Sequence, residues 1–205
     1  MQMLSRVEVM ERMTAAEFFR DAPEDRKAEL IDGVMIIPSP PLVIHERMQN
    51  FLFRLLADFV EVKQLGEVFG SRTAVELELF YAPEPDILFV SKDRLYIIGE
   101  KGIRGAPDFV IEILSASTAQ NDRGAKFRAY ERAGVREYWL IDPYGPTGTE
   151  FYQLEEGRFR PHAPDAEGSL SSVTVLGFWI DLAWLWSGQE YPPVRRALNT
   201  ILDAG

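Results

Sequence analysis

Two stretches of the chain place a Pro-Asp pair directly before a run of apolar residues: residues 84–88 (EPDIL) and residues 106–114 (APDFVIEIL). Side chains alternate along a strand, so the second stretch points Glu112 to the same side as Val110 and Leu114. A carboxylate within such an apolar strand is costly to bury alone, so Glu112 requires a partner. A metal ion, a cationic side chain or a shared proton would each serve, and Lys126 is one cationic candidate.

Each residue that could do chemistry also has a simpler interpretation. Asp86 is compatible with a turn after proline, Glu112 with half of a buried ion pair, and Lys126 with a charge on a solvated helix face. Glu29, on an early segment, is compatible with a surface or capping carboxylate. His45 is interpreted as structural, because the two histidines of the chain are too few for a convincing zinc site.

The spacing of apolar residues predicts the elements that position these side chains. Residues 43–59 have the periodicity of an amphipathic helix packed on the core. Residues 122–133 predict a second helix, which Gly134 ends. Short runs rich in branched and aromatic residues are expected to be strands. These runs are residues 67–69, 74–80, 87–90, 109–114 and 137–141.

The stretch from residue 109 to residue 141 reads as strand, helix and strand. A crossover helix between two strands of one sheet implies a right-handed parallel connection. Hairpins expected at residues 28–37, around Asp32-Gly33, and at residues 150–160 add antiparallel pairs. The sum is an α/β (α+β) fold, a mixed β-sheet flanked by helices.

The composition favours one globular domain. Of 205 residues, 46% are hydrophobic, and no linker or repeat divides them. We therefore expect a single domain over residues 1–205 with its core at about 14–186. The absence of cysteine excludes a disulfide framework, a thiolate zinc site and a cysteine nucleophile. No secretory signal or membrane-length apolar run is found, so a cytoplasmic protein is expected.

The formal net charge is −10 at pH 7. Proteins that bind nucleic acid usually carry a basic face, because neutralising phosphates supplies most of their affinity. The acidic balance lowers the expectation of tight DNA binding without metal. Clustered carboxylates suit a cation site instead, where the metal supplies the positive charge that meets a phosphate.

Pro85-Asp86, Glu112 and Lys126, in this order, resemble the PD-(D/E)XK nuclease superfamily. More narrowly, the chain resembles the Uma-type family of restriction endonucleases, through short stretches that together reach across nearly the whole chain. These stretches are residues 29–33 (ELIDG), 38–40 (PSP) with His45, 84–87 (EPDI), 107–115 (PDFVIEILS), Lys126 with Tyr130, and 134–143 (GVREYWLIDP).

The resemblance implies a restriction-endonuclease-like fold and a metal-dependent endonuclease that hydrolyses DNA. It implies that Asp86, Glu112 and the backbone carbonyl of Ile113 hold Mg²⁺ or Mn²⁺, and that Lys126 orients or activates the attacking water. Glu29 would add a supporting or second-metal carboxylate. Oxygen ligands of this kind suit Mg²⁺, which keeps waters and accepts substrate phosphate.

The chain departs from the superfamily pattern at Leu114, where many members have their lysine. The resemblance implies that the lysine role has moved to Lys126. Two alternatives stay open: a non-catalytic nuclease-fold module for protein association, and a phosphodiesterase acting on RNA or nucleotides. A homodimer is expected, because cleaving both strands needs two sites and because the tail is aromatic, with Phe178, Trp179, Trp184 and Trp186.

Overall fold

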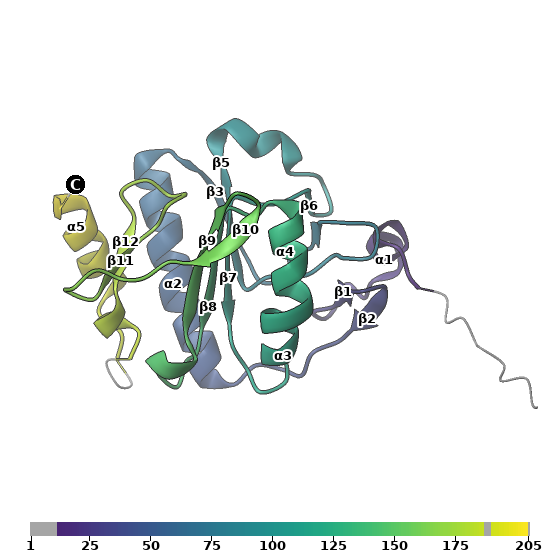
Figure 1. Ribbon diagram of the computed structural model, residues 1–205, viewed down its shortest axis with the longest axis horizontal. Helices are drawn as coiled ribbons and strands as arrows, with labels where there is room; N and C mark the ends of the chain where they lie inside the picture. The colour runs from purple at the N-terminus through teal and green to yellow at the C-terminus, as the bar shows by residue number, and fades with distance from the viewer. Residues whose placement is uncertain (1–11, 187–189, 205) are drawn as a thin grey trace, which may run out of the picture.

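The computed structural model describes residues 12–186 and 190–204 of the chain, and Figure 1 shows how its elements are arranged. Its centre is a six-stranded sheet in the order β10-β9-β8-β7-β5-β3. β7 and β8 are parallel, and the other neighbouring strands are antiparallel. With helices on both faces, this mixed sheet confirms the expected restriction-endonuclease-like fold class. The strands are β3 (Gly66–Gly70), β5 (Ile87–Ser91), β7 (Phe109–Ile113), β8 (Glu137–Ile141), β9 (Glu150–Glu155) and β10 (Arg158–Pro161).

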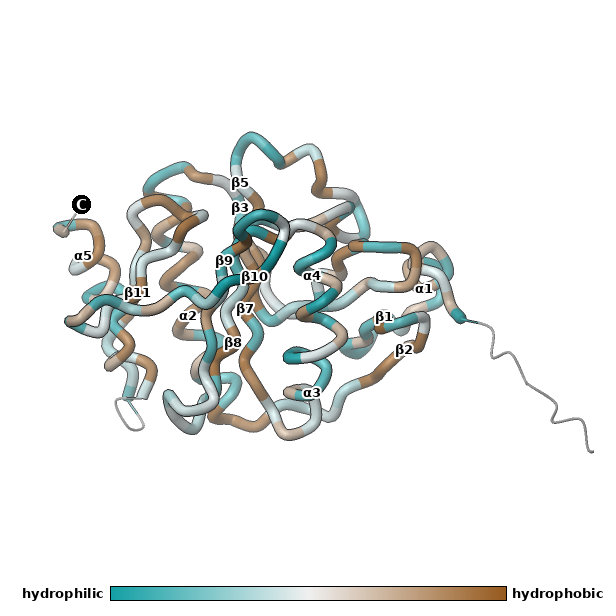
Figure 2. Tube along the Cα trace, viewed as in Figure 1, coloured by the Kyte–Doolittle hydropathy of each residue, from teal (hydrophilic) through white to brown (hydrophobic). Residues whose placement is uncertain are grey.

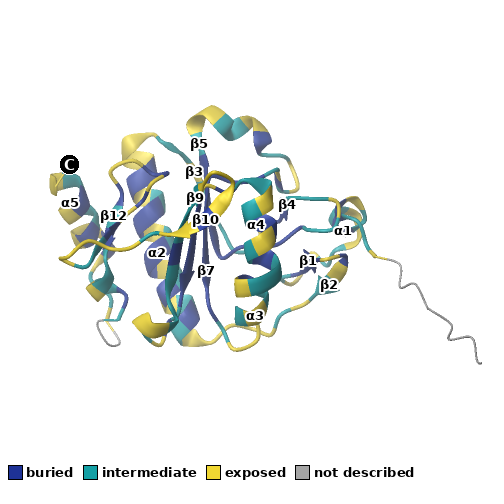
Figure 3. Cartoon of the chain, in the orientation of Figure 1, coloured by how far each residue is buried: buried dark blue, intermediate teal, exposed yellow. Residues whose placement is uncertain are grey.

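The middle strands β5, β7 and β8 are buried along almost their whole length, whereas the edge strand β10 is mostly exposed and hydrophilic (Figures 2 and 3). Strands covered on both faces are expected to be apolar throughout. β10 carries Arg158, Arg160 and Pro161, and charge and proline at an edge discourage pairing with another chain. The apolar runs therefore predicted the centre of the sheet.

The two faces of the sheet contribute to two separate hydrophobic clusters. Ile111 and Ile113 of β7 belong to the cluster that includes α2. Val110 and Leu114 belong to the other, with Tyr130 of α4. Because side chains alternate along a strand, Glu112 lies on the α4 face.

The helix α2 (Val43–Lys63) confirms the amphipathic helix expected at residues 43–59 and continues one turn further. It ends at Gln64, whose backbone is left-handed with φ of 54°. Its buried side chains are His45, Met48, Phe51, Leu52, Leu55, Leu56, Phe59 and Val60. One long helix thus covers one face of the sheet (Figure 1).

The crossover between β7 and β8 is a helix with an irregular first half. It begins as α3 (Ala119–Asn121), passes through a π-helical turn (Asp122–Lys126) and continues as α4 (Phe127–Ala133). Gly134 ends it with φ of 89°, as the sequence predicted. π-helical turns are rare and occur often at functional sites. This turn carries both Asp122 and Lys126.

Smaller elements lie beside α4, toward the N-terminus (Figure 1). α1 (Ala15–Asp21) begins with a capping box between Thr14 and Glu17. β1 (Glu29–Ile31) and β2 (Val34–Ile36) form the expected hairpin, and Asp32 and Gly33 have the positive φ values that a tight hairpin turn requires. β4 (Val75–Glu76) pairs in parallel with β6 (Ile103–Arg104).

The prediction of a strand at residues 74–80 is wrong beyond Glu76. The chain turns there, with the backbone N–H of Tyr81 donating to the carbonyl of Glu78. The branched and aromatic residues of this run suggested a longer strand. Leu79, however, is 63% exposed and contributes little to the core.

The C-terminal region packs on α2. It comprises β11 (Ser169–Ser171), β12 (Trp179–Asp181) and α5 (Val194–Ala204). Phe178 is buried against Phe59, with ring centroids 5.4 Å apart. α5 adds buried residues beyond the core expected at 14–186. The apolar tail therefore covers this chain's own core. Short 3-10 turns lie at Lys92–Ile97, Pro146–Gly148 and Leu182–Trp184.

Candidate active site

Asp86, which directly precedes β5, lies beside Glu112 of the neighbouring strand β7. β5 and β7 pair with Ile87 opposite Ile111, so continuing the antiparallel register brings Asp86 opposite Glu112. Directly opposed residues place their Cβ atoms about 5 Å apart on one face of the sheet. The backbone N–H of Ile113 donates to Oδ2 of Asp86 at 2.9 Å, which ties the two strands together at this point. The structure thus brings together the two acids and Ile113.

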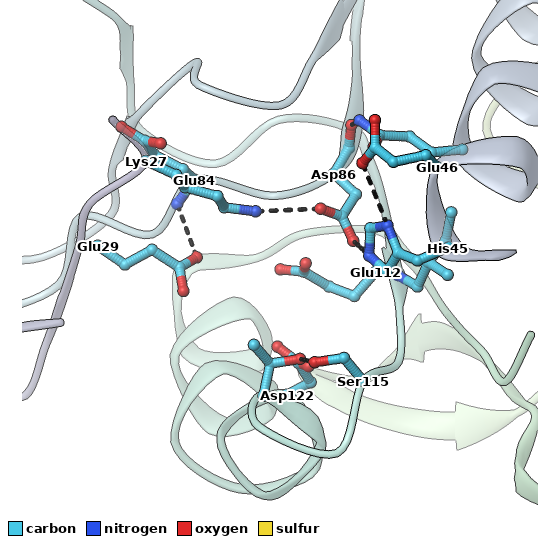
Figure 4. A network of polar contacts seen from close by, with 12 residues as sticks. Lys27, Glu29, His45, Glu46, Glu84, Asp86, Glu112, Ser115 and Asp122 are labelled. Atoms are coloured by element: carbon cyan, nitrogen blue, oxygen red, sulfur yellow. Dashed lines mark hydrogen bonds and ion pairs between the residues drawn. The ribbon is translucent and has the colours of Figure 1, made fainter. Parts of the chain in front are cut away.

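Asp86 is buried and paired with two basic side chains. Nζ of Lys27 donates to its Oδ1 at 3.0 Å, and Nε2 of His45 lies 3.2 Å from its Oδ2 (Figure 4). Gln49 donates to its backbone carbonyl at 3.1 Å. Burial opposes ionisation, but Lys27 and His45 outweigh it and hold the pKa of Asp86 below its usual value. The same pairing raises the pKa of His45 despite burial.

Glu112 receives hydrogen bonds from side chains on the α4 face of the sheet. Nζ of Lys126 donates to its Oε1 at 3.0 Å, and the hydroxyl of Tyr130 donates to the same oxygen at 2.9 Å. Burial raises the pKa of Glu112 to about 8, although the Lys126 ammonium opposes this shift. Asp86 and Glu112 are therefore neighbours with opposite pKa shifts.

Lys126 is enclosed by three carboxylates. Its Nζ lies 2.6 Å from Glu29, 3.0 Å from Glu112 and 3.1 Å from Asp122. The contact with Asp122 is an ion pair without hydrogen-bond geometry, since that Oδ1 has no hydrogen-bond partner. Lys126 is 1% exposed, and the three acids raise its pKa well above the usual value against the effect of burial. Glu29 also accepts the backbone N–H of Glu84 at 3.0 Å.

A cavity of about 430 Å³ opens onto these residues. Its floor includes Lys27, Asp86, Glu112 and Lys126, which are the groups described above. Its walls are a proline-rich loop, the first turns of α2 and the hydroxyl-bearing loop after β7. The wall residues are Pro38, Ser39, Pro40, Pro41, Leu42, His45, Glu46, Gln49, Ser71, Arg72, Ser115, Ala116, Ser117 and Thr118.

The donor set fits a divalent cation that keeps most of its own waters. The buried carboxylates near the cavity are Glu29, Glu84, Asp86, Glu112 and Asp122. The basic side chains that contact them are Lys27, Lys126 and His45, so acidic groups outnumber basic ones. Within residues 12–186 and 190–204, no group of three or more His, Cys, Asp or Glu side chains could hold a metal ion. Mg²⁺ is often held by one or two carboxylates with waters and substrate phosphate.

Lys126 was predicted as a site residue, but its polar neighbours were not. Asp122 and Tyr130 lie four residues before and after Lys126, a spacing that places side chains on one helix face and would have joined them to Glu112. His45 was interpreted as structural, and the structure places it in contact with Asp86. Lys27 lies in the segment before β1, and no periodicity marks it.

Comparisons with known proteins identify a matching fold and a family. A crystal structure from Anabaena variabilis, described as a "putative nuclease belonging to DUF820", has the same fold: the TM-score is 0.63 at 19% identity, over 92% of this chain and 99% of that one. The family described as "Putative restriction endonuclease" (Uma2) matches residues 15–183, and the chain belongs to this family. The resemblance seen in the sequence is thereby confirmed. An "Uncharacterized protein sll1609" of Synechocystis sp. is 28% identical over 137 residues, which cover 64% of this chain and 76% of that protein.

In the described part of the chain, no helix is both long enough and apolar enough to span a membrane.

Proposed function

We propose that the protein is a metal-dependent endonuclease that hydrolyses phosphodiester bonds of DNA. The observation that carries this proposal is the placement of Asp86, at the start of β5, beside Glu112 of the adjacent strand β7, where both line one cavity. Membership of a family described as restriction endonucleases supports the reaction class. In the reaction, one water adds to phosphorus and one P–O bond breaks, which gives a phosphate monoester and an alcohol.

Asp86, Glu112 and the carbonyl of Ile113 are the groups proposed to hold Mg²⁺ or Mn²⁺. When bound, the metal would supply positive charge to the phosphate and lower the pKa of a coordinated water. Lys126 would keep Glu112 and Glu29 in place through its ion pairs and stands as the lysine of the motif. Tyr130 fixes the rotamer of Glu112 by donating to Oε1.

Supercoiled plasmid, single-stranded DNA and RNA, each incubated with Mg²⁺, with Mn²⁺ and with EDTA, test this function. We expect metal-dependent nicking of DNA that Glu112→Gln reduces by at least about 100-fold, because the variant removes a metal ligand. Glu137→Gln is the matched control, since Glu137 is an equally buried carboxylate on the neighbouring strand β8 that contacts Ser172 and Thr174 instead. Cleavage of RNA alone would contradict the DNA assignment.

A second candidate function is a non-catalytic module for protein association. Lys27 and Lys126 already pair with Asp86 and Glu112 without a metal, as a purely structural network would. Titration with Mn²⁺, followed by calorimetry, separates the two functions. Binding that Asp86→Asn abolishes supports the nuclease, and no binding at millimolar Mn²⁺ supports the module.

We propose a homodimer because of the reaction, and not because of the aromatic C-terminal tail. One site per chain cuts one strand, so cutting both strands favours a two-fold pair. The aromatic tail is partly used within the chain, where Trp179 and Trp184 pack against the α2 core. Sedimentation of the protein with and without duplex DNA tests the dimer. A DNA substrate also fits the cytoplasmic location expected from the sequence.

A further inference from the structure

The two lysines at the cavity floor have different surroundings. Lys126 is 1% exposed and has three carboxylates within 3.1 Å of its Nζ. The side chain of Lys27 is 23% exposed, and Asp86 is its one ion-pair partner among the described residues. Figure 4 shows Lys27 reaching from the N-terminal segment to Asp86. The lysine of the expected motif is thus the less accessible of the two.

An ammonium group has three N–H donors. Lys126 donates to Glu112, and Glu29 and Asp122 also lie within 3.1 Å of its Nζ, so carboxylates surround this buried ammonium and leave it little room to reach a bound phosphate. Lys27 directs one donor to Asp86 at 3.0 Å, and its flexible stem lets the charged head move within the cavity. Lys27 therefore has more freedom than Lys126 to reach a bound phosphate.

The other cationic residues that line the cavity are less suited to a substrate contact. Arg72 directs its guanidinium to the backbone carbonyls of Glu24 and Asp25. His45 directs Nε2 to Asp86, and its Nδ1 faces Glu46 at 3.6 Å. Among the described residues of the cavity, Lys27 is the lysine that contacts Asp86 and keeps unused N–H donors.

We propose that Lys27 is the lysine that contacts the scissile phosphate, whereas Lys126 only holds the acids in place. This assignment rests on the proposed function. The Lys27 ammonium would leave Asp86 as a divalent cation binds there and donate to a non-bridging phosphate oxygen. It supplies charge as the water adds and the P–O bond breaks. No bond to its nitrogen forms, and it keeps its protons.

Three variants test this role: Lys27→Met, Lys27→Arg and the control Lys92→Met. Lys92 is exposed and follows β5, about 20 Å along the strand from Asp86. Lys92→Met therefore removes the same charge far from the cavity. Three quantities are measured: Mn²⁺ affinity by calorimetry, affinity for a single-stranded oligonucleotide in Ca²⁺, and single-turnover cleavage in Mg²⁺.

For Lys27→Met we expect Mn²⁺ to bind equally well or up to about 10-fold more tightly, because the competing ammonium is gone. Oligonucleotide affinity should fall by about 10-fold and cleavage by about 100-fold, as for the loss of one charged donor at a phosphate. Lys27→Arg should retain part of both activities, and Lys92→Met should match the wild type within about 2-fold.

Labelling of the wild-type protein with an amine-reactive reagent, read by mass spectrometry, needs no variant. Lys27 should react, and the oligonucleotide in Ca²⁺ should protect it, while Lys126 stays unreactive throughout. If the oligonucleotide does not protect Lys27, or if Lys27→Met cleaves at the wild-type rate, the proposed role of Lys27 is wrong. Neither result contradicts the proposed nuclease function. A wild-type protein without metal-dependent cleavage overturns the proposed function, and this inference with it.

Discussion

At the scale of single residues, the two central carboxylates are stabilised in different ways. Asp86 is ionised by contact with Lys27 and His45, which lower its pKa. Glu112 has its pKa raised by burial and receives hydrogen bonds from Lys126 and Tyr130 on one oxygen. When burial raises the pKa of a carboxyl group, a cation that binds beside it strongly stabilises its ionised form. The pair is therefore poised to accept positive charge.

Tyr130→Phe removes the hydroxyl donor of Glu112 and keeps the buried ring. We expect the free energy of unfolding to fall by about 1–2 kcal/mol, the range for a hydrogen bond to an acidic group, measured by urea titration at pH 7. Tyr138→Phe is the control, since its hydroxyl donates to a neutral backbone carbonyl of Asp122 at 3.1 Å. Equal losses in the two variants would show that Glu112 stabilises the protein no more than a neutral acceptor does.

Glu137 gives a prediction on pH. Burial raises its pKa above the usual 4.5, although Ser172 and Thr174 donate to it. A carboxyl whose pKa is higher in the folded protein binds its proton more tightly there, so its contribution to stability is complete below pH 4.5 and is lost as pH rises through the raised pKa. Wild type should therefore lose stability relative to Glu137→Gln between pH 5 and pH 8, by at most about 1.4 kcal/mol per pH unit. Unfolding free energies of both proteins at four pH values test the sign, and parallel curves would refute it.

At the scale of elements, Lys126 joins three parts of the fold. Its partners are Glu29 of β1, Glu112 of β7 and Asp122 of the π-helical turn. The turn places Asp122 and Lys126 over the sheet, so the irregular half of the crossover helix and the N-terminal hairpin meet at one ammonium. This residue fixes the geometry of the acids whether or not it touches a substrate.

Lys126→Met leaves three buried carboxylates without their shared cation. Removing one partner of a buried ion pair typically costs about 3–5 kcal/mol, so we expect a loss of that size in urea unfolding. The double variant Lys126→Met/Glu112→Gln should regain part of it, because one uncompensated charge is removed. A loss under about 1 kcal/mol in the single variant would show that the acids take up protons freely instead.

Two glycines of the crossover helix give a matched pair of predictions. A Cβ at Gly134 or at Gly124 meets nothing within 4 Å, so backbone conformation alone decides the outcome. Gly134→Ala should cost about 1–2 kcal/mol, because φ there is 89°. Gly124→Ala should instead stabilise by about 0.5–1 kcal/mol, since Gly124 lies in a helical turn. Thermal unfolding of both variants checks the opposite signs.

At the scale of the whole molecule, the sequence predicted what depends on local pattern. The strands β5, β7 and β8 were predicted because apolar runs buried on both faces are continuous. α5 was not predicted, although Val194, Ala197 and Ile201 have helical spacing. The sequence does not show which surface the apolar face of this helix packs against. The pairing of Asp86 with Glu112 depends on the register of β5 and β7. The contact of Lys27 with Asp86 depends on the path of an irregular segment. Such long-range geometry has no local signal.

A bound metal ion should raise the free energy of unfolding of the whole protein. A cation present at 100 times its Kd stabilises by about 2.7 kcal/mol, which is roughly 5–10 °C in Tm for a chain of this length. We expect Mg²⁺ or Mn²⁺ to raise Tm relative to EDTA and Asp86→Asn to abolish the rise. Asp108→Asn should keep it, because Asp108 pairs with Arg94 and Arg136 instead. An equal rise in both variants would point to binding elsewhere.

The contact between Glu29 and Lys126 also bears on how the protein is made. A ribosome that has released the chain through β7 has already delivered Glu29, Asp86 and Glu112, but Lys126 is still in the exit tunnel or not yet synthesised. The acids then lack the ammonium that orders them, and closing contacts of such sequence separation is slow. A nascent or truncated chain that stops before the crossover helix would therefore lack the ordered acids on which the proposed nuclease depends.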